Sequence, residues 1–138
     1  IGRTQSYDLT PERAYARHLA AALEEVDLRR RQIARTGARA ATPDEVGRLG
    51  GDLAASFSRA AAALAALEPP PPAKAAHALL TRALGTAAAA YTALASAGSG
   101  GGASELLHAR ARVRAAEASV DEGLEAFSLL GYGPAPGG

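Results

Sequence analysis

The sequence predicts an all-α protein: an antiparallel up-down-up-down four-helix bundle with non-helical N- and C-terminal segments, folded as a single domain over residues 1–138. Alanine, which has the highest intrinsic helix propensity, is the most frequent residue. Four stretches of similar length carry apolar side chains at helical spacing. Their connections are short, which favours antiparallel neighbours. The predicted helices cover residues 11–35, 43–67, 72–95 and 104–130.

The first predicted helix has clear signals at both ends. Thr10 is a favourable N-cap, Pro11 suits the first helical position, and Gly37 is a typical stop. The apolar side chains that fall on one face between these signals are Tyr15, Leu19, Ala22, Val26 and Ile33.

The second predicted helix begins with a capping box at residues 42–45, TPDE, and ends before the four prolines of residues 69–72. Its apolar positions recur every seven residues. The pair Gly50 and Gly51 interrupts them and has two interpretations. It either lets a neighbouring helix approach the backbone or breaks the helix, which would favour an extended three-helix array.

The third predicted helix carries an apolar row at alternating steps of four and three, which is typical of a bundle seam. We expect a flexible loop over residues 96–102, SAGSGGG, after it. The fourth helix carries small residues between apolar positions seven apart, and residues 131–138 form a Gly/Pro tail that cannot be helical. The apolar rows are Leu80, Leu84, Ala87, Tyr91 and Leu94, then Leu106, Val113, Val120 and Phe127.

Composition excludes several classes of function. The formal net charge is +1, so we expect no nucleic-acid partner. The chain has no cysteine, which excludes thiolate chemistry, disulfides, cysteine-ligated zinc and covalently attached haem. No apolar run reaches the ~18 residues of a membrane span. A signal peptide, a lipid anchor or a membrane segment before Ile1 stays open.

His77 is the candidate cofactor-binding residue, because its spacing places it on the apolar seam of the third helix. A core histidine can ligate a metal or a tetrapyrrole, or act as a general base. The alternative is a structural hydrogen bond. His18 and His108 fall on helix flanks, where we expect surface residues. The paired Glu-x-x-His motifs of di-metal bundles are missing, so we predict no metal and no cofactor.

An enzyme is the least favoured hypothesis. No nucleophile motif occurs, and GSGGG at residues 98–102 lacks the lysine and the strand of a phosphate-binding loop. Glu117 lies beside the seam of the fourth helix. It would support catalysis only with a histidine within hydrogen-bond distance. We therefore assign no catalytic residue.

A basic run at the end of the first helix is the candidate partner-binding patch. Acidic lipid headgroups or an acidic protein surface would suit it. The alternative is favourable charge at a helix C-terminus. The candidate partner-binding residues are Arg29, Arg30, Arg31, Arg35, Arg39 and, in the tail, Tyr132.

The stretch around the prolines carries a family resemblance. Leu64, Leu67, Pro69, Pro70 and His77, followed by Leu80 and an alanine-rich helix, form a pattern that resembles uncharacterised alanine-rich helical proteins exported or lipid-anchored by high-GC bacteria. The resemblance implies an extracytoplasmic helical bundle (periplasmic, cell-surface or secreted) and transfers no catalytic residue.

Together these observations predict a non-enzymatic interaction or accessory subunit of a larger extracytoplasmic assembly. Other protein chains or further copies of itself would contact its termini and helix surfaces, and a membrane surface could contact residues 29–39 or a segment before Ile1. The alternative is a bundle that binds a small ligand or cofactor through His77.

Overall fold

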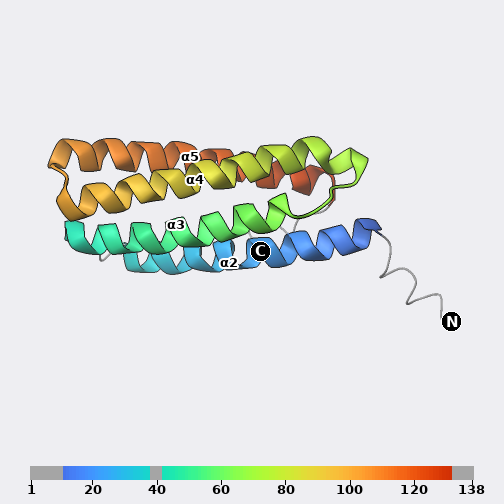
Figure 1. Ribbon diagram of the computed structural model, residues 1–138, viewed down its shortest axis with the longest axis horizontal. Helices are drawn as coiled ribbons and strands as arrows, with labels where there is room; N and C mark the ends of the chain where they lie inside the picture. Colours follow the sequence, from blue (N-terminus) through green and yellow to red (C-terminus); the bar gives the residue numbers. More distant parts are fainter. Residues whose placement is uncertain (1–10, 38–41, 132–138) are drawn as a thin grey trace.

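The computed structural model describes residues 11–37 and 42–131, and these residues form four long helices with no strand among them. Successive helices lie side by side and run in alternate directions (Figure 1), which confirms the antiparallel four-helix bundle. The elements are α2 (Pro11–Gly37), α3 (Pro43–Ala65), the 3₁₀ turn η1 (Pro71–Ala73), α4 (Lys74–Gly100) and α5 (Ala103–Leu129). The two terminal segments and residues 38–41 lie outside the described residues.

The capping box predicted at the start of α3 is confirmed. The Thr42 side-chain oxygen accepts a hydrogen bond from the Glu45 backbone N–H at 3.2 Å, and Glu45 Oε1 accepts one from the Thr42 N–H at 3.3 Å. The prolines end the helix as expected, although α3 stops at Ala65 and α4 starts at Lys74, each two residues from the predicted bound.

The flexible loop predicted over residues 96–102 is wrong for most of its length, because α4 continues to Gly100. Gly98 explains the difference: a Cβ there would lie 2.6 Å from the Pro43 carbonyl oxygen and 2.8 Å from Gly47 Cα. The backbones of α3 and α4 therefore touch at this point. Contact with α3 holds in a helix a segment that would be flexible alone.

Gly50 permits close packing, whereas Gly51 faces open space, and α3 continues unbroken through both. A Cβ on Gly50 would lie 3.0 Å from the Tyr91 carbonyl oxygen and 3.1 Å from the Ala95 nitrogen. The three-helix array is therefore wrong. Gly123 plays the same part between α5 and α4, where its Cβ would lie 3.1 Å from Leu80 Cα.

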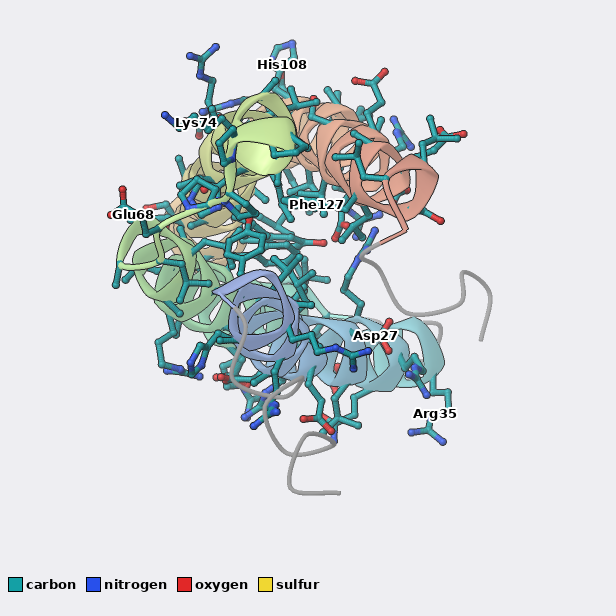
Figure 2. The ribbon with its side chains drawn as sticks, turned by 90° about the vertical axis from the view of Figure 1, so that its right-hand side faces the viewer. Asp27, Arg35, Glu68, Lys74, His108 and Phe127 are labelled. Carbon is teal, nitrogen blue, oxygen red and sulfur yellow. The ribbon has the colours of Figure 1, made fainter. Side chains whose placement is uncertain are left out.

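One hydrophobic core joins all four helices, with Phe57, Leu84, Val120 and Phe127 fully buried. The end-on view in Figure 2 shows the helices around this core, with Phe127 pointing into it. The helix backbones pack closely from α2 to α3, from α3 to α4 and from α4 to α5. The fourth side of the bundle, between α2 and α5, is joined mainly through side chains.

Among the described helices, none is long and apolar enough to cross a membrane.

Candidate functional site

His77, the predicted cofactor-binding residue, points into the core and bonds to α2. His77 is only 9 % exposed, and a hydrogen bond of 2.7 Å joins its Nδ1 to the Tyr15 hydroxyl. The Tyr15 ring also lies against Phe127 of α5, with centroids 6.3 Å apart. Burial lowers the pKa of His77, and a hydrogen bond to the backbone of Leu64 partly opposes this shift. The imidazole is therefore held in its neutral form.

These bonds favour the structural interpretation of His77. A metal or tetrapyrrole on Nδ1 would first have to displace Tyr15, which is itself only 3 % exposed. Within residues 11–37 and 42–131, no group of three or more His, Asp or Glu side chains could hold a metal ion. Direct ligation through His77 stays a prediction that this geometry does not favour.

Glu117 lies at the centre of a second polar cluster, which joins three helices. The Tyr91 hydroxyl of α4 donates a hydrogen bond to Glu117 Oε2. From α2, Arg30 Nη2 lies 2.6 Å from Glu117 Oε1 and 2.9 Å from Asp121 Oδ1. We call the contacts of Arg30 with these two carboxylates the Arg30 clasp. Glu117 Oε1 is buried, and Arg30 meets it as a close ion pair rather than as an aligned hydrogen bond.

The surroundings of Tyr91 keep its hydroxyl protonated. Burial is the main cause that raises the Tyr91 pKa, the Glu117 carboxylate raises it further, and Arg30 acts in the opposite direction. Phe57 of α3 stacks on the Tyr91 ring, with centroids 5.5 Å apart. The cluster is thus a hydrogen-bonded, ion-paired crosslink between helices. The partners of Glu117 are a tyrosine and an arginine, and not the histidine that the catalytic hypothesis requires.

The structure divides the predicted basic patch. The Arg30 side chain is 24 % exposed and belongs to the clasp, whereas the Arg31 side chain is 71 % exposed and pairs with Asp27 one turn earlier in the same helix. Arg29 is half-buried and Arg35 is exposed. Arg39 and Tyr132 lie outside the described residues. The patch therefore presents fewer surface cations than its sequence suggests.

A neighbouring ion pair joins α2 to α3. Glu25 accepts hydrogen bonds from Arg59 and from Ser56, whose hydroxyl lies 3.3 Å from Oε2. The Arg59 guanidinium is the main cause that lowers the Glu25 pKa. This pair lies near the surface, so it adds little to stability by itself.

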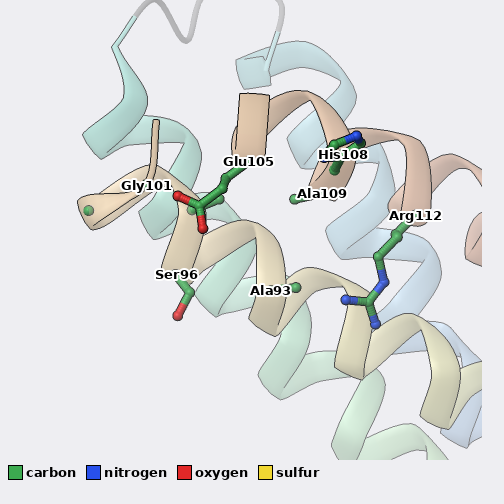
Figure 3. Close-up of a pocket in the computed structure, with 9 residues that line it drawn as sticks. Ala93, Ser96, Gly101, Glu105, His108, Ala109 and Arg112 are labelled. Atoms are coloured by element: carbon green, nitrogen blue, oxygen red, sulfur yellow. The ribbon is translucent and has the colours of Figure 1, made fainter. Parts of the chain in front are cut away.

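A shallow groove between α4 and α5 has small residues on its floor (Figure 3). Glu105 and Arg112 reach from α5 towards α4, while His108 is exposed, as predicted for it and for His18. Glu105 is already engaged, because its Oε1 accepts a hydrogen bond from the Gly102 N–H at 3.1 Å. The lining residues are Ala93, Ser96, Ala97, Gly100, Gly101, Glu105, His108, Ala109 and Arg112.

The outer face of α4 is a surface that the sequence reasoning missed. After Arg82 the helix contains no Asp, Glu, Lys, Arg or His up to its last residue, Gly100. The uncharged residues recur at steps of four and three on the side of the helix opposite its core seam, and this spacing is visible in the sequence. We define the outer face of α4 as the exposed residues Gly85, Thr86, Ala89, Thr92, Ser96 and Ser99.

The fold and these clusters define an all-α four-helix bundle whose interior polar side chains crosslink its helices. Comparison of the chain with protein-family models, with curated proteins and with solved structures found no significant match. The resemblance to exported alanine-rich helical proteins stays a prediction.

Proposed function

We propose that this protein is a non-enzymatic interaction subunit that binds another protein chain through the outer face of α4. The observation that carries the proposal is a row of exposed, small and uncharged side chains, about 21 Å long from Gly85 to Ser99 at 1.5 Å per residue. Soluble surfaces usually have roughly 25–35 % charged residues, which keep molecules apart. This stretch has none.

The hydroxyl groups on the outer face of α4 are partly satisfied within the helix. Thr92 Oγ1 donates to the Ala88 carbonyl at 2.9 Å, and Ser99 Oγ donates to the Ala95 carbonyl at 3.0 Å. Covering Thr92 and Ser99 would therefore cost little in desolvation, because each hydroxyl keeps its hydrogen bond within the helix.

The inner side of α4 shows that small residues allow a neighbouring helix to approach closely. There Gly98 lets the α3 backbone approach to van der Waals distance. On the opposite side, Gly85 and Ala89 also leave the helix backbone close to the surface, and a Cβ on Gly85 would meet no atom within 4 Å. The partner surface that fits best is a helix that can approach closely between small side chains.

The proposal includes an extracytoplasmic location, which follows from the family resemblance alone. Arg31 and Arg35 of α2 are exposed and would add a secondary contact for acidic groups.

A photo-crosslinking side chain placed at Ala89 tests the proposal in the native cell. The matched control carries the same side chain at Ala118, which is exposed on α5. We expect the Ala89 probe, and not the Ala118 probe, to form an adduct with one defined protein, which mass spectrometry identifies. A second copy of this chain would be one such partner.

Binding of the purified partner then gives the quantitative result. We expect Ala89→Arg to weaken binding at least about tenfold and Ala118→Arg to leave it unchanged, with both variants keeping the wild-type circular dichroism. The proposal would be wrong if both probes gave the same adducts, or if Ala89→Arg bound as tightly as the wild type.

A further inference from the structure

We propose that α2 is a releasable helix, which separates as a unit from α3, α4 and α5 while these three stay folded together. We call these three helices the three-helix core. The inference concerns a conformational device of the bundle and does not depend on the function proposed for the outer face of α4.

The packing inside the three-helix core differs from the attachment of α2. Gly47, Gly50 and Gly98 bring α3 and α4 into backbone contact, and Gly123 does so for α5 against Leu80. The close contacts of α4 with α3 and with α5 involve many residue pairs besides these glycines, and they cannot be loosened at one point without cost elsewhere.

The attachment of α2 is narrower. Its backbone packs closely along α3, and towards α4 and α5 the described contacts are made by side chains. The backbone contact of α2 with α3 is less extensive than the contact of α3 with α4 or of α4 with α5. Among the side chains of α2 that the structure describes, the buried ones are Tyr15, Leu19, Leu23 and Val26.

Described polar contacts fasten this stripe at three points along α2, which are Tyr15, Glu25 and Arg30. Tyr15 is bonded to His77 near the start of α2, and the Arg30 clasp lies near its end. These two contacts cross to α4 and α5, whereas Glu25 pairs with Arg59 of α3, and release must break all three. Release would return the charges of Arg30, Glu117 and Asp121 to water, so part of their separation energy is recovered by solvation.

Release has a defined consequence for the surface. Phe127, which lies against Tyr15, would lose its cover on that side, and so would the Tyr91–Glu117 pair. The device therefore alternates between a closed bundle and a three-helix core with an open apolar groove, without complete unfolding.

Native-state hydrogen exchange of the full chain, read by mass spectrometry, tests the proposal with two kinds of variant. Gly98→Ala strains the α3–α4 contact, which is intact both in the closed state and after α2 is released. We expect it to accelerate the slowest amides of α4 about tenfold and to leave those of α2 unchanged. If the chain opened only as a whole, both helices would respond equally.

Arg30→Ala breaks a contact that is present only in the closed state. We expect it to accelerate the amides of α2 and the slowest amides of α4 by the same factor, about tenfold, because both openings start from the weakened closed state. Asp121→Asn, which keeps the Arg30–Glu117 pair, should act in the same direction by a smaller factor. Arg31→Ala is the matched control and should change neither.

Two results would overturn the inference. One is an equal acceleration of α2 and α4 by Gly98→Ala, which would show a single all-or-none opening. The other is an unchanged exchange rate of α2 in both Arg30→Ala and Asp121→Asn, which would show that its amides open by local fraying and not by release.

Discussion

His77 and Glu117 reach the interior from α4 and α5, and each meets a side chain of α2 there. Tyr15 bonds to His77, and Arg30 pairs with Glu117. Buried polar groups destabilise a fold unless they have hydrogen-bonding or ionic partners, and these two pairs supply such partners from a neighbouring helix. At the scale of single residues, these two interior polar pairs crosslink the helices of the bundle.

The buried His77 should make stability depend on pH. Its pKa is lowered in the folded state, so the unfolded chain takes up the proton first as the pH falls through 6.5. The stability that neutral His77 contributes is fully present above pH 6.5 and decreases as the pH falls below 6.5. The decrease stops once the pH is below the pKa of His77 in the folded state. We expect the free energy of unfolding, measured by chemical denaturation, to fall between about pH 8 and about pH 5.

A comparison of variants isolates the part due to His77. His77→Gln should lose this component and keep the part that comes from carboxylates, whereas replacing the exposed His18 and His108 by Gln should leave the profile unchanged. A His77→Gln variant with the full wild-type slope in this range would contradict the assignment.

Removing the hydroxyl should have opposite effects on stability at Tyr91 and at Thr81. Tyr91→Phe keeps the ring stacked on Phe57 but leaves Glu117 Oε2 without its donor, so we expect a loss of about 1–2 kcal/mol in urea unfolding. Thr81 Oγ1 is buried without a hydrogen-bond partner. Thr81→Val should therefore be neutral or stabilising, and a similar loss in both variants would contradict this account.

At the scale of elements, backbone contact at Gly98 explains why α4 extends beyond its predicted end. Local signals predicted the start of α3, because a capping box is complete within four residues. Local signals failed at the end of α4, where Ser and Gly suggest a loop but the approach of Pro43 and Gly47 keeps Gly98 in a helix. A contact between residues about fifty positions apart leaves no mark in a short window of sequence.

Two glycines of α4 should respond to alanine in opposite ways. Gly98→Ala places a Cβ within 2.8 Å of the α3 backbone, and we expect a loss of roughly 1–3 kcal/mol. Gly85→Ala meets open space and should gain about 0.5–1 kcal/mol through helix propensity. Thermal and urea unfolding measure both, and a stabilised Gly98→Ala variant would mean that α3 and α4 are not in contact there.

At the scale of the whole molecule, the bundle has one side that differs from the other three. Three helix pairs are joined by close backbones, and the fourth pair, α2 and α5, is joined mainly by the Arg30 clasp and by rings. Since the α2–α3 contact is also less extensive than the α4–α5 contact, α2 is the helix that we propose to be releasable. The uncharged outer face of α4 is a second asymmetry, and it lies on a helix of the three-helix core.

The Arg30 clasp should be visible in global stability. Arg30→Ala leaves the buried Oε1 of Glu117 without its cation, and we expect a loss of about 1–3 kcal/mol in the free energy of unfolding. Arg31→Ala removes an exposed pair within one helix and should stay within about 0.5 kcal/mol of the wild type. Equal losses for the two arginines would show that Arg30 acts only as a surface charge.

The sequence by itself determined the fold class, the helix periodicity and the cap of α3, because these follow from local propensity and the spacing of apolar residues. It also placed His77 on the apolar seam of the third helix and Glu117 beside the seam of the fourth. Only the tertiary structure decided their partners, the burial of Arg30 and the helical state of residues 96–100. Periodicity tells which side of a helix turns inward, whereas the residue that it meets depends on how neighbouring helices are aligned.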